Sequence, residues 1–551
     1  MDTTTKLTGA LPVLIIIAAL FTTMASWVLL RRYKKATVKG MSKIAGYGTV
    51  DSTKKNALKG PAELRFRTLT DTAGREKSVS PNFKSLKSTL RTSRMIYLLS
   101  GLTYALFMTT AYIITSEGGF VIRRFLWLMT CFAWPTVISI LLTKAKKRGI
   151  VQNPLSIYAI LLVLVMVVTL IRNENLDFFQ LVFFWLWVNG PSSLLLLLFL
   201  QKKIRAVGPI VLAFMVVALA GAFLGLEVLG TSDLVLEKIA TIGAQIGIGA
   251  VFTLLVVLAL GFTVFGFIGW FVLKLLGLWY NKKHFSARML TLYALFLFFG
   301  IVQSIALAFE GLFWFYTGPL AFLAYITVSK MGFKKLIKKN ASNERSPKLL
   351  YLRVFALGRR SEQFFDQFTR WWGNIGGISL ISGPDLATSA VEPHEFLDFM
   401  GGRLSRQFVK DKKDLDGRLE LVDYKPDPDG RYRINDFFCR ADNWKHTMQK
   451  LSRQSDVVLM DLRSFSSANM GCVFELEQLL DLVSLSEIMF LVDKTTDHAF
   501  LKETLNELWK SIDIESPNAV NNNPTVLLFQ LQKSEFMPTI LIEQLLEKAV
   551  L

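Results

Sequence analysis

Polar side chains suited to phosphate and sugar recognition end or follow several short apolar runs in the C-terminal part of the chain. They are glycines, arginines, a serine and carboxylates, namely Gly358, Arg359, Arg360, Ser382, Gly383, Asp385, Asp461 and Arg463. Arginine binds phosphate through two parallel hydrogen bonds, and carboxylates accept hydrogen bonds from ribose hydroxyls. We therefore predict that these residues bind a ligand that carries phosphate and ribose. Turn formation alone is the alternative, because tight turns also select Gly and Asp.

A single glutamate, Glu475, is the candidate for catalysis. It lies one turn into the stretch 472–483, whose apolar residues recur at helical spacing. A carboxylate beside a sugar can stabilise or trap the oxocarbenium-like state that forms when a glycosidic bond breaks. Arg359, Arg360 or Arg463 would then hold the pyrophosphate of the substrate. The alternative is a structural glutamate, because the helix dipole favours negative charge in a first turn.

These candidate residues depend on a sheet that brings the ends of the apolar runs together. Five such runs alternate with stretches of helical periodicity, and they cover residues 349–357, 378–381, 457–462, 488–492 and 525–531. This alternation predicts a five-stranded parallel sheet with helices on both faces, as in a flavodoxin-like α/β domain over residues 348–551. Ligands of such sheets bind at the carboxyl ends of the strands. Residues 410–440 are polar and rich in turn formers, so no strand is predicted there.

The stretch around Glu475 carries a resemblance to a known family. Residues 456–480 read DVVLMDLRSFSSANMGCVFELEQLL, in which an apolar strand ends in a short serine-bearing loop. The element Cys472-Val473-Phe474-Glu475-Leu476 then opens a helix. This pattern resembles TIR domains and the related nucleoside deoxyribosyltransferases. The resemblance implies a TIR-like domain with NAD as a possible substrate, NAD cleavage by Glu475, and association of the domain with further copies of itself.

The rest of the chain has the composition of a membrane protein. The 551 residues are 52% apolar, and a run of about 20 mostly apolar residues is long enough for a spanning helix. We predict about nine spans, at 11–30, 96–115, 120–143, 155–171, 178–200, 207–226, 240–262, 289–309 and 312–328. Residues 263–280 are apolar and rich in tryptophan, and we expect them to extend the seventh span or to lie at the membrane interface.

The distribution of basic residues predicts an orientation for these spans. With the N-terminus outside, the loops on the cytoplasmic side hold 33 Lys/Arg and those on the opposite side hold five. This topology gives a first transmembrane helix at 1–30, a helical bundle at 95–330 and a basic linker at 331–347, and it leaves the C-terminal domain in the cytoplasm. The basic segment 31–94 lacks apolar periodicity and is predicted to be largely disordered cytoplasmic chain. A bacterial inner membrane is the expected location.

Charge and cysteine content exclude several classes of function. Residues 340–551 hold 25 Lys/Arg and 31 Asp/Glu, so the basic excess behind the net charge of +20 lies in the membrane part and no nucleic-acid partner is expected. Three cysteines and four histidines form no metal-binding motif, so no metal site is predicted.

Three functions stay open. One is a signalling or defence protein with a nucleotide ligand, one is a transporter or channel with a regulatory domain, and one is a non-enzymatic scaffold that forms homo-oligomers.

Overall fold

The computed structural model describes most of the chain, with gaps between the described ranges. These ranges are residues 3–43, 63–70, 81–116, 118–143, 153–171, 177–200, 202–230, 233–247, 249–340, 346–355, 358–386, 391–532 and 539–550. The chain divides into two compact units. The helical unit contains residues 1–31, 93–335 and 392–397, and the α/β unit contains residues 32–92, 336–391 and 398–551.

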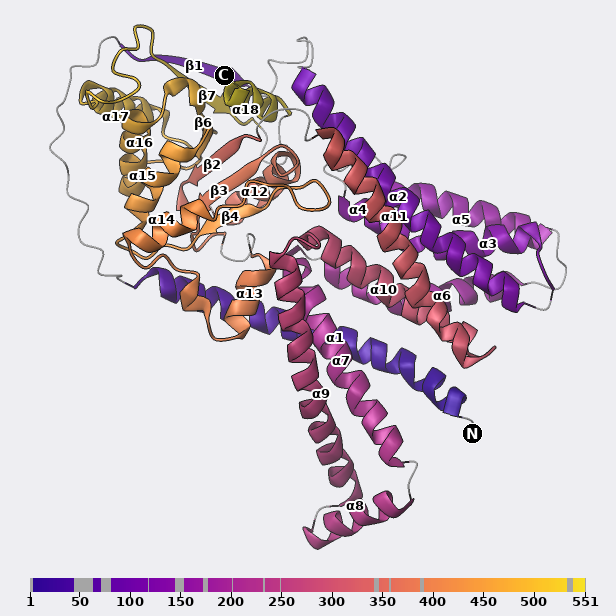
Figure 1. Cartoon of the computed structure of the whole chain (residues 1–551). Helices are drawn as coiled ribbons and strands as arrows, with labels where there is room; N and C mark the ends of the chain where they lie inside the picture. The colour runs from indigo at the N-terminus through magenta and orange to yellow at the C-terminus, as the bar shows by residue number, and fades with distance from the viewer. Residues whose placement is uncertain are drawn as a thin grey trace. The chain divides into compact units, whose positions relative to one another are not determined.

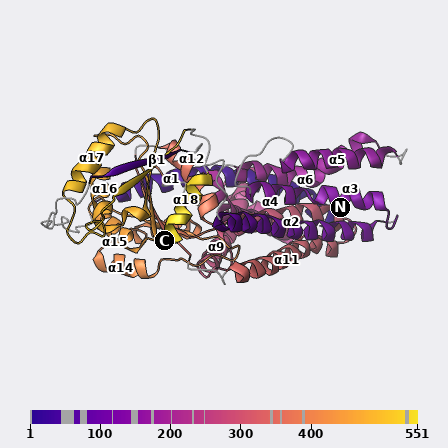
Figure 2. The same ribbon diagram turned by 90° about the horizontal axis from the view of Figure 1, so that it is seen from above.

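The first unit is built from helices. They are α1 (Thr3–Met41), α2 (Pro81–Thr115), α3 (Ile122–Phe132), α4 (Trp134–Thr143), α5 (Pro154–Ile171), α6 (Phe178–Leu200), α7 (Lys202–Gly230), α8 (Asp233–Gln245), α9 (Ala250–Asn281), α10 (Ala287–Ala308), the short 3-10 helix η2 (Leu312–Tyr316) and α11 (Thr317–Asn340). Helix α3 lies beside α5, and α7 packs along α9 (Figure 1). Figure 2 shows α2, α3 and α5 running lengthwise in this unit.

Five helices in the described part of the chain are long and apolar enough to cross a membrane. They are Phe83–Thr115, Ile122–Thr143, Pro154–Ile171, Val251–Asn281 and Ala287–Ile305. Phe178–Gly190 and Val207–Phe223 are apolar but shorter. The structure is therefore compatible with a membrane protein, while the number of nine spans is not confirmed.

Helix α9 begins and ends later in the sequence than the span predicted at 240–262. That stretch is interrupted at Gly247, which has a φ of +75° and separates α8 from α9. Helix α9 then continues to Asn281, so residues 263–280 extend the helix, which is one of the two arrangements expected for them. The positive φ explains the break, because only glycine adopts it without strain.

The second unit contains the sheet. Its strands are β1 (Arg65–Thr70), β2 (Lys348–Arg353), β3 (Gly377–Ile381), β4 (Ile434–Phe437), β5 (Val457–Asp461), β6 (Ile488–Val492) and β7 (Thr525–Gln530). Its helices are α12 (Arg359–Trp372), α13 (Pro393–Met400), η4 (Leu404–Arg406), α14 (Lys412–Glu420), α15 (Trp444–Gln454), α16 (Met470–Leu482), η5 (Leu485–Glu487), α17 (His498–Lys510) and α18 (Thr539–Val550), of which α13 is shared with the helical unit.

The seven strands form one parallel sheet in the order β1-β7-β6-β5-β2-β3-β4. The inner order β3-β2-β5-β6-β7 is that of a flavodoxin-like sheet, so the five predicted strands are present and adjacent. The count of five is wrong, because β4 and β1 extend the two edges. Strand β4 arises from the polar stretch 410–440, where a four-residue edge strand needs little apolar sequence.

Helices cover both faces of the sheet (Figure 1). One core joins β2, β5, β6 and β7 to residues of α14, α15, α16 and α17. The other core joins the sheet to α12 and α18, through side chains that include Phe365, Phe368, Leu541 and Leu545. The middle strands are buried on both faces, which explains why their sequences are continuous apolar runs.

The segment predicted as disordered, 31–94, contributes to this domain in the described parts of residues 32–92, while residues 44–62 and 71–80 lie outside the described residues. Strand β1 pairs with β7 from Arg65↔Thr525 to Thr70↔Gln530. At the start of α2, Phe83, Leu86 and Leu90 are buried in the core that contains α12 and α18, and Phe83 stacks on Trp371 with ring centroids 6.0 Å apart. The prediction was wrong for these parts, since a few apolar residues within a basic sequence find their partners only in the folded domain.

The predicted start of the α/β domain at residue 348 also differs from the limits of the α/β unit in the structure. The first part of the predicted linker 331–347 is helical, because α11 continues to Asn340, and residues 341–345 lie outside the described residues. The α/β unit therefore consists of residues 336–391 and 398–551 together with residues 32–92.

Candidate functional site

Glu475 is a buried carboxyl group with an unused hydrogen-bonding atom. It lies in α16, and its residue is only 2% exposed. Its Oε2 atom accepts no hydrogen bond from any residue in the described part of the chain. Burial raises the pKa of Glu475 from its ordinary value near 4.5 to about 8, and the charge of Arg353 opposes this shift. The side chain is therefore protonated at neutral pH in this structure.

Arg353, at the end of β2, is held by Asp385 in the loop after β3. Its Nε donates to Asp385 Oδ2 at 2.9 Å and its Nη2 donates to Asp385 Oδ1 at 2.8 Å. Nη1 donates to the carbonyl of Ile381 at 3.2 Å. Both side chains of the ion pair are nearly inaccessible to solvent. The Arg353 guanidinium therefore lies near Glu475 at the carboxyl edge of the sheet, with its charge balanced by Asp385.

Sequence reasoning missed Arg353 because it extended the first strand to residue 357. The strand ends at Arg353, four residues earlier. The available signal was an arginine inside the apolar run LLYLRVFAL, since an unpaired charge at a core position is costly and implies a buried partner. Asp385, which was predicted to bind the ligand, is that partner.

Asp461 and Arg463, both predicted, form a second buried ion pair at the end of β5. Arg463 Nε lies 2.8 Å from Asp461 Oδ1, and Arg463 Nη2 lies 2.6 Å from Oδ2. The Tyr351 hydroxyl donates to the same Oδ2 at 3.1 Å. The Arg463 guanidinium also stacks 4.6 Å from the Phe364 ring centroid. Arg463 is thus committed to a carboxylate, and it would have to leave Asp461 to bind a pyrophosphate.

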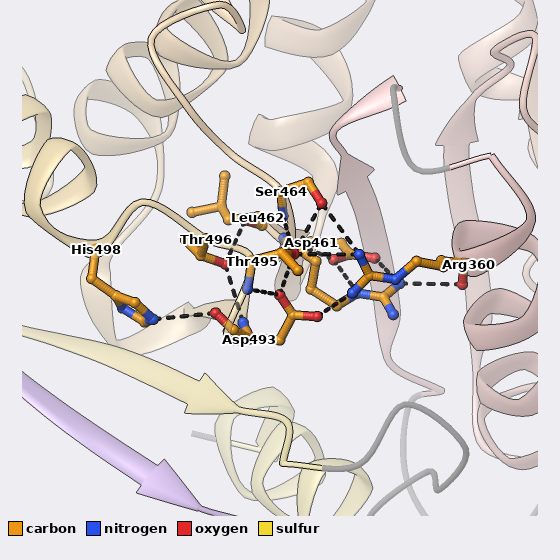
Figure 3. A network of polar contacts seen from close by, with 9 residues as sticks. Arg360, Asp461, Leu462, Ser464, Asp493, Thr495, Thr496 and His498 are labelled. Carbon is orange, nitrogen blue, oxygen red and sulfur yellow. Dashed lines mark hydrogen bonds and ion pairs between the residues drawn. The ribbon is translucent and has the colours of Figure 1, made fainter.

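Arg360 is the most accessible of the site arginines whose side chains are described. Figure 3 shows it reaching from α12 to Asp493, which follows β6, and forming an ion pair there. Its Nη1 atom also donates to Ser464 Oγ and to Thr495 Oγ1, each at 3.3 Å. Because the Arg360 side chain remains 38% exposed, it can reach a ligand in solvent.

Asp493 is held in place by its own loop, as Figure 3 shows. Its Oδ1 accepts hydrogen bonds from the amide and the hydroxyl of Thr495, at 2.9 and 2.6 Å. Ser464, which bonds to Thr495 Oγ1, has a φ of +58°, an uncommon conformation for a residue other than glycine. His498 Nε2 lies 3.2 Å from the Asp493 carbonyl oxygen. The loops after β5 and β6 are therefore connected by side-chain hydrogen bonds.

The other predicted ligand-binding residues lie at the ends of β2 and β3. Gly358 precedes α12 as its N-cap, with a φ of +51°, while the Arg359 side chain lies outside the described residues. Ser382 donates to Asp436 Oδ2 at 3.1 Å. A Cβ atom on Gly383 would lie 2.5 Å from Phe355 Cε1, so a larger residue would displace that ring.

The described side chains form two groups at one edge of the sheet. Arg353, Asp385 and Glu475 form the first group, and Arg360, Asp461, Arg463 and Asp493 form the second. The two groups meet at Tyr351, whose pKa is raised, first by burial and then by the Asp461 charge, with Arg463 and Arg353 opposing the shift. No cluster of three metal-binding side chains occurs among the described residues.

The sequence matches no protein-family model and no curated protein.

Proposed function

We propose that the chain is a membrane-embedded signalling or defence protein whose α/β unit binds NAD or a related nucleotide at the carboxyl edge of its sheet. The observation that carries the proposal is the buried Oε2 atom of Glu475, which has no partner among the described residues. Buried polar atoms without partners are rare in folded proteins, and each calls for an explanation such as a bound group. The topology that fits this role has the N-terminus outside and the α/β unit in the cytoplasm.

The electrostatics of the site support a cationic ligand near Glu475. Arg353 is already neutralised by Asp385, so it leaves little charge for Glu475. A positively charged nicotinamide ribose would favour the ionised carboxylate and lower its pKa, because an opposite charge nearby stabilises the charged form. Binding would therefore release a proton at neutral pH. Arg360 is the accessible cation for the phosphates of the ligand.

The reaction that this arrangement supports is hydrolysis of the bond between nicotinamide and ribose. The C–N bond breaks with its electron pair passing to nicotinamide, which leaves as a neutral molecule. The oxocarbenium-like sugar is stabilised by the Glu475 carboxylate. Water then adds its oxygen to the sugar carbon and gives up a proton, for which the carboxylate is a suitable acceptor.

The test uses the full chain in detergent, with NAD supplied at millimolar concentration. We expect nicotinamide release and a thermal shift by wild type, loss of nicotinamide release in Glu475→Gln, and no change in Glu503→Gln, which removes an exposed glutamate of α17. A thermal shift without nicotinamide release would restrict the function to nucleotide sensing. Neither binding nor turnover by wild type would refute the proposal.

The polar groups inside the helical unit argue against a transport site. Asn189 and Gln303 are buried and bonded to each other, with Gln303 Nε2 3.1 Å from Asn189 Oδ1. The Tyr104 hydroxyl donates to Gln303 Oε1 at 2.7 Å, and Asn189 Nδ2 donates to the carbonyl of Cys131 at 3.2 Å. These groups satisfy one another, which is typical of side chains that fix helix packing.

A further inference from the structure

Helix α1 has two opposite faces that continue along its length from Ala18 to Gly40. One face is buried and includes Ala18, Thr22, Ser26, Leu30, Tyr33 and Thr37. The spacing of three or four residues places these side chains in one stripe, since an α-helix turns about 100° per residue. Tyr33 packs edge-on against Phe399, with ring centroids 5.4 Å apart. A Cβ atom on Gly40 would lie 2.3 Å from the Phe408 ring, so the end of this face is tightly packed.

The opposite face of α1 changes from apolar to basic along the helix. Its exposed residues from 20 to 28 are Leu20, Phe21, Met24, Trp27 and Val28, all apolar or aromatic. At the same angular positions further along, the exposed residues are basic. They are Arg31, Arg32, Lys34, Lys35 and Lys39. The stretch 31–43 contains no acidic residue, so this basic face has uniform charge.

A tryptophan marks the change between the two parts of this face. The Arg31 guanidinium carbon lies 3.4 Å from the centroid of the Trp27 ring. Tryptophan is enriched at the boundary between acyl chains and headgroups, and basic residues next to it extend into the headgroup region. Lys34 and Lys35 lie about 11 to 12 Å beyond Trp27 along the axis, at about 1.5 Å per residue. Their long side chains therefore reach the depth of the headgroups.

We propose that the exposed face of α1 contacts lipid along its length, and that Arg31, Lys34, Lys35 and Lys39 bind the headgroups of anionic phospholipids. The charge of this face is complementary to an anionic leaflet, and the apolar residues before it match the acyl chains. The opposite face is already packed against the protein, so the basic side chains cannot turn inward. This inference is independent of the nucleotide ligand.

The test compares lipid binding by two matched triple variants of the full chain. Lys34→Gln, Lys35→Gln and Lys39→Gln are combined in one variant. The control combines Lys410→Gln, Lys412→Gln and Lys413→Gln, which removes three exposed lysines at the start of α14. Native mass spectrometry in mild detergent counts the phosphatidylglycerol and phosphatidylcholine molecules bound to each protein, and thermal unfolding verifies that both variants are folded.

We expect wild type and control to prefer phosphatidylglycerol, and the α1 variant to lose this preference by about fivefold for each lysine removed. An unchanged preference in the α1 variant, or an equal loss in both variants, would overturn the proposal. Inorganic phosphate is added as a competitor, to distinguish binding of lipid headgroups from binding of a free anion. If phosphate at millimolar concentration abolishes the preference, the site binds free phosphate and the lipid surface is refuted.

Discussion

Replacing Glu475 by Gln tests the buried carboxyl group through the pH dependence of stability. The folded protein holds a proton on Glu475 up to about pH 8, whereas the unfolded chain releases it near its ordinary pKa of 4.5. Folding therefore becomes less favourable as the pH rises from about 4.5 to about 8, and the effect is constant above that range. Glutamine resembles the protonated acid in shape and is neutral, so the variant lacks this dependence.

The size of the effect follows from the two pKa values. The ionisation of Glu475 in the unfolded chain costs about 1 kcal/mol of stability at pH 5, about 3 kcal/mol at pH 7 and about 5 kcal/mol at pH 9. Since 1 kcal/mol shifts the midpoint of a domain of this size by about 2–4 °C, we expect Glu475→Gln to unfold roughly 6–12 °C above wild type at pH 7. The difference should be smaller at pH 5 and larger at pH 9.

The assay is thermal unfolding of the full chain in detergent at pH 5, 7 and 9, followed by hydrogen exchange of peptides from β5 and α16. Glu503→Gln is the control, because an exposed glutamate has no comparable burial. Parallel midpoints for wild type and Glu475→Gln across the whole pH range would contradict this prediction, since they would mean that Glu475 titrates normally.

Three further predictions concern the packing of the α/β unit. Phe83→Ala should destabilise the α/β unit by about 3–5 kcal/mol, measured by denaturant unfolding, because its buried ring stacks on Trp371. Asp385→Asn should cost about 3–5 kcal/mol in the same measurement, since it leaves the buried charge of Arg353 without its carboxylate, and a loss below 1 kcal/mol would contradict the buried ion pair. Arg67→Pro should increase hydrogen exchange in β7, whereas Thr68→Pro should not. The reason is the direction of the amides in β1. The Arg65 amide donates to the carbonyl oxygen of Pro524, and in a parallel strand every second amide points to the same neighbouring strand. The Arg67 amide therefore also points to β7, whereas the Thr68 amide does not.

The local pattern of the sequence determined the central strands of the domain. Strands such as Val457–Asp461 and Ile488–Val492 are buried on both faces, so they had to be continuous apolar runs. The alternation of these runs with helical periods predicted a parallel sheet, and the carboxyl ends of the strands predicted Asp385, Asp461 and Arg463 as members of one polar edge. Such information is local, because burial selects residue types at each position.

Tertiary structure alone decided which partners these side chains have. Arg353 and Asp385 are separated by 32 residues and Arg360 and Asp493 by 133, and no spacing rule relates them. Strand β1 was missed for the same reason, since its partner β7 lies about 460 residues away and an edge strand needs few buried residues. The burial of Glu475 likewise comes from packing around α16, so its raised pKa is a property of the fold.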